Sequence, residues 1–181
     1  MIKYLFMLVI SSVVCKDAIR PNFLIILTDD QDSTLGGMNP MKNVQQFIGD
    51  KGVTFKNAYV TSPICCPSRA SFLTGLYVHN HLTVNNSLSG GCYGRIWKNI
   101  ESRTFATTLS DAGYKTFYAG KYLNERDLSI SYIENQTGSE PFLMVLAPPA
   151  PHQPFTPAPR HKGVFANVTA HRAPNFNIAV K

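Results

Sequence analysis

Residues 22–30 read N-F-L-I-I-L-T-D-D, an unbroken apolar run of strand length that ends in two adjacent carboxylates. An apolar run without polar alternation is typical of a central parallel strand that is buried on both faces. In an open α/β sheet, ligands bind beyond the carboxyl ends of the strands. The stretch therefore predicts a parallel sheet and places Asp29 and Asp30 where a ligand site would form.

The segments that follow alternate between helical and extended patterns, which predicts an α/β domain with a mainly parallel sheet flanked by helices. Pro67 suits the first turn of a helix, Thr104 suits a helix cap, and Gly113 suits a helix stop. The expected elements are a helix over residues 41–52, a strand over 53–60, a helix from Pro67 through Leu73, a helix between Thr104 and Gly113, and strands over 114–119 and 141–147.

Three of the expected strands lead into different polar groups. The first ends at the two aspartates, another runs into Lys121, and the last continues through a proline-rich turn to His152. Cys65 and Cys66 stand just before the helix of Pro67, where free N–H groups and the helix dipole favour an anion. We expect these groups to converge on one anion and one cation.

The chain has 181 residues, of which 44% are hydrophobic and 15% charged, enough for one globular domain. Its net charge of +6 would suit a polyanionic partner such as a sulfated glycan. The lysines and arginines are scattered, without the basic runs or interleaved aromatic residues of a nucleic-acid module. We therefore expect no nucleic-acid partner.

The first residues have the layout of a secretory signal peptide. Lys3 precedes an apolar run that ends near Cys15 and is too short to span a bilayer. A buried N-terminal strand is the alternative. We expect residues 1–15 to be a signal peptide and 16–181 to be a mature chain that enters the secretory pathway and has no membrane span. Three N-glycosylation sequons agree with this route, at Asn85, Asn135 and Asn167.

The adjacent Cys65 and Cys66 match neither a zinc site, which needs two separated pairs, nor a mutual disulfide, whose partners are distant in sequence. They begin the block C-C-P-S-R at residues 65–69, which is followed by L-T-G at 73–75. This block resembles the signature of the sulfatase family, C-x-P-S-R with a downstream L-T-G. The resemblance implies an alkaline-phosphatase-like sulfatase N-terminal domain. It also implies that a formylglycine-generating enzyme oxidises Cys65 to the aldehyde formylglycine.

Further stretches extend the resemblance along the chain: P-N-F-L-I-I-L-T-D-D-Q-D, L-G-G-M, Y-V-H-N-H, G-K-Y-L-N-E and A-P-H-Q-P-F. Within the family, they are most similar to the lysosomal glucosamine-6-sulfatases and slightly less similar to the extracellular heparan endosulfatases. These enzymes remove the 6-O-sulfate of glucosamine units in heparan or keratan sulfate. The resemblance therefore implies a sulfated glycosaminoglycan substrate and a lysosomal destination, with the extracellular space as the alternative.

The resemblance also assigns roles to the first matched positions. Asp29, Asp30 and the modified Cys65 would bind calcium, a hard cation that prefers oxygen ligands. One hydroxyl of the hydrated aldehyde would attack sulfur, and the second would then help to expel sulfate. Arg69 would orient the hydrate and offset the charge that develops on it.

Two positions further along the chain match the remaining parts of the family site. Lys121 would bind sulfate oxygens, and His152 would donate a proton to the departing sugar oxygen. Many sulfatases carry a histidine two residues after the lysine, but Leu123 stands there in this chain and Asn124 follows it. The glucosamine-6-sulfatases share this change, which leaves a role for Asn124 open.

The expected site is incomplete. In the family, an Asp-Asn pair in a D-N-G motif completes the calcium site, and this chain contains no D-N-G. The resemblance also skips several dozen residues between Glu125 and Asp127. We therefore expect an N-terminal sulfatase fragment with an internal deletion and little activity of its own. A non-catalytic glycan-binding remnant and a related metal-dependent phosphodiesterase are the alternatives, and Cys66 and Cys92 could either pair or stay free.

Overall fold

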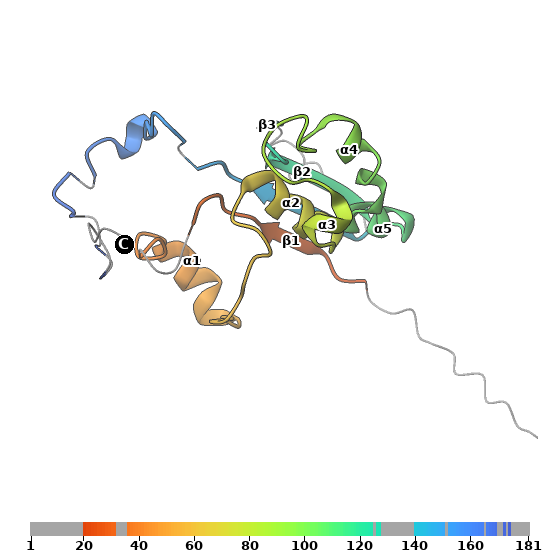
Figure 1. Cartoon of the computed structure of the whole chain (residues 1–181). Helices are drawn as coiled ribbons and strands as arrows, with labels where there is room; N and C mark the ends of the chain where they lie inside the picture. Colours follow the sequence, from red (N-terminus) through yellow and green to blue (C-terminus); the bar gives the residue numbers. More distant parts are fainter. Residues whose placement is uncertain are drawn as a thin grey trace, which may run out of the picture.

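A computed structural model describes residues 20–31, 36–124, 126–127, 140–150, 152–164, 166–169, 172 and 174 (Figure 1). The expected signal peptide and the sequon at Asn135 lie outside these residues. The sequons at Asn85 and Asn167 lie within them, and both asparagines are exposed. No helix in this described part of the chain has the length and apolarity that a bilayer crossing requires.

The sheet has four strands in the order β1-β4-β2-β3. β1, β4 and β2 run parallel, and β3 pairs antiparallel with the end of β2. The expected mainly parallel sheet is therefore confirmed, and the carboxyl ends of three strands meet at one edge. The strand bounds are β1 (Phe23–Ile26), β2 (Lys115–Lys121), β3 (Arg126–Asp127) and β4 (Phe142–Ala147).

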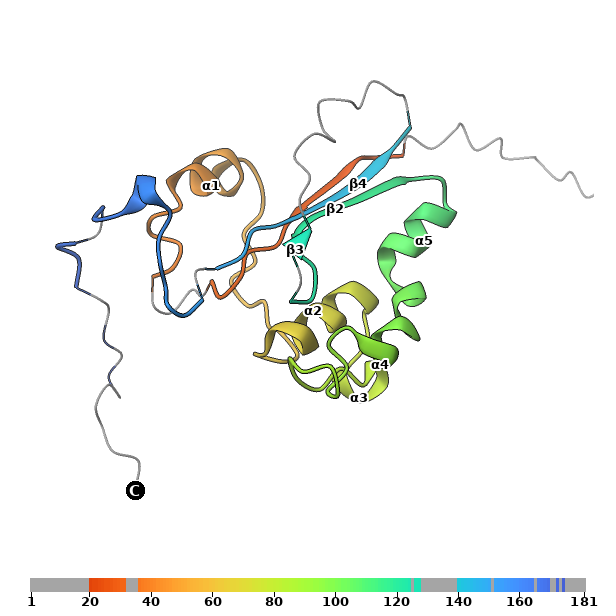
Figure 2. The same cartoon turned by 90° about the horizontal axis from the view of Figure 1, so that it is seen from above.

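Four helices cover one face of this sheet (Figure 2). They are α2 (Cys65–Thr74), α3 (Val78–His81), α4 (Gly94–Lys98) and α5 (Phe105–Asp111). The helix α1 (Lys42–Phe47) lies apart from them, beyond the carboxyl ends of the strands. Three short 3-10 helices complete the described elements: η1 (Gly49–Lys51), η2 (Glu101–Arg103) and η3 (Pro159–His161).

The core lies between the sheet and the four helices. The central strand β4 contributes buried residues that include Leu143 and Val145. A second cluster of buried side chains packs around α2 and consists of Cys66, Ala70, Leu73, Cys92, Trp97 and Leu123. The helix that carries the cysteine pair is therefore anchored in the core, which fixes the position of its first turn.

The local signals at the helix ends are confirmed. The Thr104 hydroxyl accepts a hydrogen bond from the N–H of Thr107 at 3.4 Å and caps the start of α5. Gly113 follows the end of α5 with a φ of 83°, a left-handed conformation that glycine adopts without strain. β2 begins two residues later, so this turn sets the direction in which the strand approaches the site.

Two expectations about the sheet are wrong. Residues 53–60 form no strand, and Phe55 is 81% exposed. β1 lies at the edge of the described sheet rather than at its centre, and Leu24 is 57% exposed. An apolar run identifies residues that could be buried, but burial also needs a neighbouring element, and among the described strands β1 has only β4 beside it.

Candidate active site

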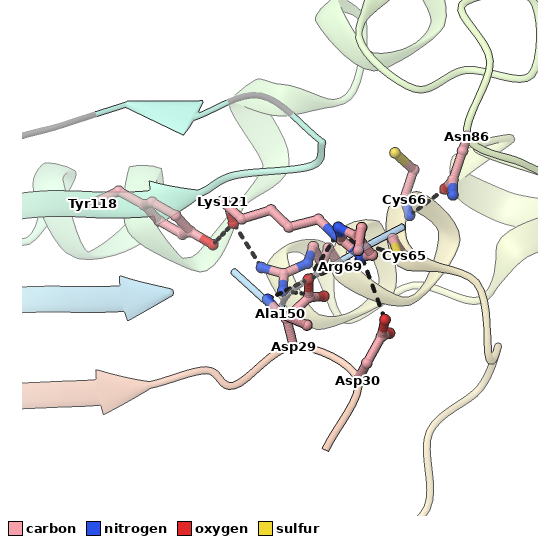
Figure 3. Close-up of polar contacts among 10 residues, drawn as sticks. Asp29, Asp30, Cys65, Cys66, Arg69, Asn86, Tyr118, Lys121 and Ala150 are labelled. Carbon is pink, nitrogen blue, oxygen red and sulfur yellow. Dashed lines mark hydrogen bonds and ion pairs between the residues drawn. The ribbon is translucent and has the colours of Figure 1, made fainter. Parts of the chain in front are cut away.

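The site is built around Asp29, which follows β1 and has a side chain that is only 4% exposed. Arg69 Nη2 donates to one carboxylate oxygen of Asp29 at 3.0 Å. Lys121 Nζ donates to the other oxygen at 2.8 Å, and the N–H of Ala150 donates to that same oxygen at 3.1 Å. Figure 3 shows this carboxylate at the centre of contacts from α2, the end of β2 and the chain after β4.

The partners of Asp29 decide its charge. Burial alone would raise the pKa of this carboxyl group. The hydrogen bonds from Lys121, Ala150 and Arg69 outweigh burial, so the pKa of Asp29 lies below its ordinary value. The carboxylate is therefore ionised at neutral pH and compensates two cations whose side chains are almost as buried as its own.

Lys121 is fixed at both of its ends. Besides its bond to Asp29, its Nζ lies 3.4 Å from Cys65 Sγ and 3.4 Å from His152 Nε2. Its backbone carbonyl accepts hydrogen bonds from Arg69 Nη1 at 2.6 Å and from the Tyr118 hydroxyl at 2.9 Å. Burial raises the pKa of Tyr118, which keeps this hydroxyl a donor. This role of Tyr118 could not be predicted from the sequence, because a tyrosine within a strand gives no sign of contacts at the strand end.

Asp30 and His152 form the exposed side of the site. Asp30 has a φ of 50°, a left-handed conformation that aspartate tolerates better than most residues. His152 Nε2 lies 3.3 Å from an Asp30 oxygen and 3.4 Å from an Asp29 oxygen. The two adjacent carboxylates thus bracket one imidazole, while the carboxylate of Asp29 also reaches into the buried network.

One atom from each of Asp29, Asp30, Cys65 and His152 lies within 4.8 Å of the others, close enough to surround one cation. The two carboxylates suit a hard divalent ion such as calcium, whereas sulfur and nitrogen do not. An oxygen at position 65, as in formylglycine, would add a third suitable donor. Calcium takes six to eight oxygen ligands, so these residues fit as part of a calcium site.

The first turn of α2 holds the cysteine pair and differs from the expectation in one respect. Cys65 is the free cysteine among the described residues, and Cys66 is bonded to Cys92. The free N–H groups expected at this helix start are largely used. The Cys66 N–H donates to Asn86 Oδ1 at 2.9 Å, the Ser68 N–H donates to the Ile64 carbonyl at 2.9 Å, and a proline between them has no N–H.

Two cavities open beside Cys65. The first has a volume of about 230 Å³ and is lined by residues that include Asp29, Asp30, Cys65 and Arg69. The second has a volume of about 430 Å³, and its lining is Asp30, Cys65, Asn86, Lys121, Asn124, Pro149 and His152. The structure therefore brings together all six candidate residues, and it adds Asn86 and Asn124 as further polar groups at the larger cavity.

His81 is fully buried and has a structural role. Its Nδ1 accepts a hydrogen bond from the Thr83 N–H at 3.1 Å, so the proton of the neutral ring is on Nε2, which lies 2.9 Å from Ser71 Oγ. Burial lowers the pKa of His81, and the nearby His79 lowers it further. A second proton would have to enter at Nδ1, opposite the Thr83 N–H.

We expect this arrangement to make the fold less stable in acid. Because the pKa of His81 is lower in the folded chain, the unfolded chain binds the proton first, and stability is lost as pH falls below about 6.5. The urea midpoint should decrease between pH about 7 and about 5, and His81→Gln should flatten that decrease. His79→Gln is the comparison and should flatten the decrease less than His81→Gln, because burial lowers the pKa of His81 more than His79 does. A slope that is equally steep in His81→Gln would contradict this assignment.

Comparisons with known proteins agree with the fold and with the C-C-P-S-R block at the site. The family described as Sulfatase matches residues 21–127. The chain is 39% identical over 220 residues to the N-acetylglucosamine-6-sulfatase of Capra hircus, covering 90% of this chain and 39% of that protein. It is 35% identical over 213 residues to the extracellular sulfatase SULF-1 homolog of Drosophila melanogaster, covering 88% of this chain and 19% of that protein.

A solved structure of a protein in complex with its substrate D-glucosamine-2-N,6-O-disulfate shares the fold. Its TM-score is 0.62 at 23% identity, over 86% of this chain and 40% of that one. This likeness, together with the parallel sheet and its flanking helices, confirms the expected α/β fold class.

The chain spans about two fifths of the length of the goat relative. The alignment with that relative is 220 residues long, but it includes only 90% of the 181 residues of this chain. The relative therefore has several dozen residues within the matched region that this chain lacks. This difference agrees with the expected internal deletion.

The family match, the C-C-P-S-R block at the start of α2 and the shared fold lead to one assignment. The chain belongs to the sulfatase family.

Proposed function

We propose that this site is that of a formylglycine-dependent sulfatase that removes 6-O-sulfate from N-acetylglucosamine units of heparan or keratan sulfate. The observation that carries the proposal is the position of Cys65. Its Sγ lies 3.4 Å from Lys121 Nζ and in one cluster with two carboxylates and an imidazole. The names of the goat relative and of the ligand in the similar structure support the choice of a 6-sulfated glucosamine.

Each polar group has a task that its contacts allow. Lys121 presents a buried cation at the larger cavity, where it can hold sulfate oxygens. His152 lies at the exposed side of that cavity, where it can donate a proton to the departing sugar oxygen. Arg69 is almost fully buried against Asp29 and the Lys121 carbonyl, so in this structure it acts as a positioning residue.

Asp29 and Asp30 are the residues that would hold calcium, together with position 65. When bound, the cation supplies Lewis-acid polarisation of the sulfate group. Asp29 already carries its negative charge, because its pKa is lowered. Asp30 lies beside it with an exposed side chain, which leaves its oxygens accessible for binding.

The proposal includes a secretory route, with a lysosomal destination and the extracellular space as the alternative. The Cys66–Cys92 disulfide supports this route, because disulfides persist in oxidising compartments. The same route would expose Cys65 to the formylglycine-generating enzyme and the sequons at Asn85, Asn135 and Asn167 to glycosylation. It would also bring the chain to its sulfated glycosaminoglycan substrate.

The proposal also keeps the expectation that this chain alone has little activity, because the described residues supply two carboxylates to a cation that takes six to eight ligands. A non-catalytic glycan-binding remnant is the second candidate, and the net charge of +6 favours it. Heparin binding that is lost in high salt, without any sulfate release, would distinguish it from a working sulfatase.

The test is peptide mass spectrometry across residue 65, using chain secreted by a eukaryotic host. We expect the mass of formylglycine at position 65 and of cysteine at position 66. An unmodified thiol at position 65 would contradict the proposed chemistry and would favour the phosphodiesterase alternative. Sulfate release from N-acetylglucosamine 6-sulfate should be measured on the same sample, with Cys65→Ala as the control. Turnover that persists in this variant would exclude position 65 as the nucleophile.

A further inference from the structure

Asn86, which lines the larger cavity, lies on a loop that is attached to α2 at two points. The Cys66–Cys92 disulfide holds one end of the loop, and the Cys66 N–H donates to Asn86 Oδ1 at 2.9 Å. Within the loop, the Val84 N–H donates to the Gly90 carbonyl at 2.7 Å and closes its neck. A single residue of α2 therefore fixes Asn86 at the cavity through both its backbone and its side chain.

The contact with Cys66 leaves one group of the Asn86 side chain available. The amide oxygen accepts the Cys66 N–H, so the NH₂ group of the same amide is the donor that remains. Asn86 is exposed and lines the cavity together with Cys65, Lys121 and His152. Figure 3 shows its amide oxygen directed at the Cys66 nitrogen, on the same side of the site as Cys65.

Hydrogen bonding polarises this amide. A donor that bonds to the carbonyl oxygen of an amide draws electron density away from its nitrogen and strengthens the N–H groups as donors. The N–H of Cys66 belongs to the first turn of α2, so its partial positive charge acts in this direction. The Cys66 N–H is thus used within the protein, and the NH₂ group of Asn86 is a strengthened donor at the cavity.

We propose that Asn86 is a further substrate-binding residue, whose side-chain NH₂ donates to an oxygen of the sulfate group held beside Lys121. This inference rests on the proposed function, because it takes the larger cavity as the sulfate site. The competing interpretation is that Asn86 serves only as a cap for the Cys66 N–H and that substrate never touches it.

Asn86→Asp separates these two roles. Aspartate keeps an oxygen for the Cys66 N–H and replaces the NH₂ donor with an acceptor. The matched control is Asn85→Asp, which adds the same charge one residue away. Asn85 is exposed, does not line the cavity, and uses its oxygen to accept from Ser87, a role that aspartate retains.

The measurement is the affinity for inorganic sulfate and for N-acetylglucosamine 6-sulfate, followed by NMR titration of chain exported to the periplasm of a bacterium that adds no glycan to Asn85. We expect Asn86→Asp to weaken both affinities about tenfold or more, because a charge-assisted hydrogen bond is lost and replaced by repulsion. Asn85→Asp should weaken them less than about threefold, as expected for a screened surface charge. Equal, small effects of the two variants would overturn the inference and leave Asn86 as a cap.

The unmodified chain provides a second readout that does not depend on any variant. During the sulfate titration, the side-chain NH₂ resonances of Asn86 should shift and those of Asn85 should not. Absence of the Asn86 shift while Lys121 responds would overturn this inference but leave the proposed function standing. Absence of any sulfate binding by the unmodified chain would overturn both.

Discussion

Asp29→Asn is expected to lower the free energy of unfolding by about 3–5 kcal/mol, the cost of leaving a buried charge without its partner. The Asp29 carboxylate lies between Arg69 and Lys121, and all three side chains are buried. Asparagine has nearly the same shape but no charge, so both cations would stay buried without an anion. One carboxylate at the end of β1 therefore stabilises the contacts that hold α2 and β2 together.

The measurement is urea unfolding at neutral pH, with Asp30→Asn as the matched control. The Asp30 side chain is 58% exposed, and its ion pair among the described residues is with His152. Asp30→Asn should therefore change the free energy of unfolding by less than about 0.5 kcal/mol. Because the pKa of Asp29 is lowered, its contribution is present above the ordinary carboxyl range and is lost in acid. The free energies of unfolding of the unmodified chain and of Asp29→Asn should therefore converge at low pH. Equal losses in both variants at neutral pH would contradict this account.

The positions of the site residues could largely be predicted from the sequence, because a physical rule connects them. Parallel strands bring their carboxyl ends to one edge, so polar residues that follow β1, β2 and β4 must lie near one another. Asp29, Lys121 and His152 are the residues found there. The helix with Pro67 in its first turn is also confirmed, which places Cys65 at the same edge.

Other parts could not be predicted, because they depend on what covers a segment rather than on the segment itself. The apolar pattern of residues 53–60 is that of a strand, yet these residues lie exposed beside no strand of the described sheet. Asn86 reaches α2 from a loop 20 residues further along the chain, and no local pattern indicates that contact. Tyr118 contacts Lys121 across the end of its own strand, which strand periodicity does not reveal.

The cysteine pairing also required the structure. Cys65 and Cys66 are adjacent, so their separations from Cys92 in the sequence, 27 and 26 positions, differ too little to choose between them. On a helix, neighbouring side chains point about 100° apart, which corresponds to 3.6 residues per turn. Cys66 is fully buried against Cys92, whereas Cys65 faces Lys121 and the site. Helix geometry thus separates a disulfide-bonded cysteine from a free one at the site.

Removal of the Cys66–Cys92 disulfide is expected to lower the free energy of unfolding by about 3.5 kcal/mol in the chain-entropy description of a loop of this length. The bond joins residues that are 26 positions apart, and it connects α2 to the loop that carries Asn86. Without it, the unfolded chain gains conformational freedom and the loop that carries Asn86 loses one of its two attachments to α2. Urea unfolding of Cys66→Ala, Cys92→Ala and the double variant would measure the effect.

The three variants should lose nearly the same stability, because each one removes the same bond. Reductant should lower the stability of the unmodified chain and should not affect these three variants. Losses that add up in the double variant would mean that the two cysteines act independently and are not bonded. Cys65→Ala is the control and should change stability by less than about 0.5 kcal/mol, since its thiol is free. A large loss in Cys65→Ala would mean that Cys92 pairs with Cys65. The thiol that the proposed formylglycine formation requires would then be blocked.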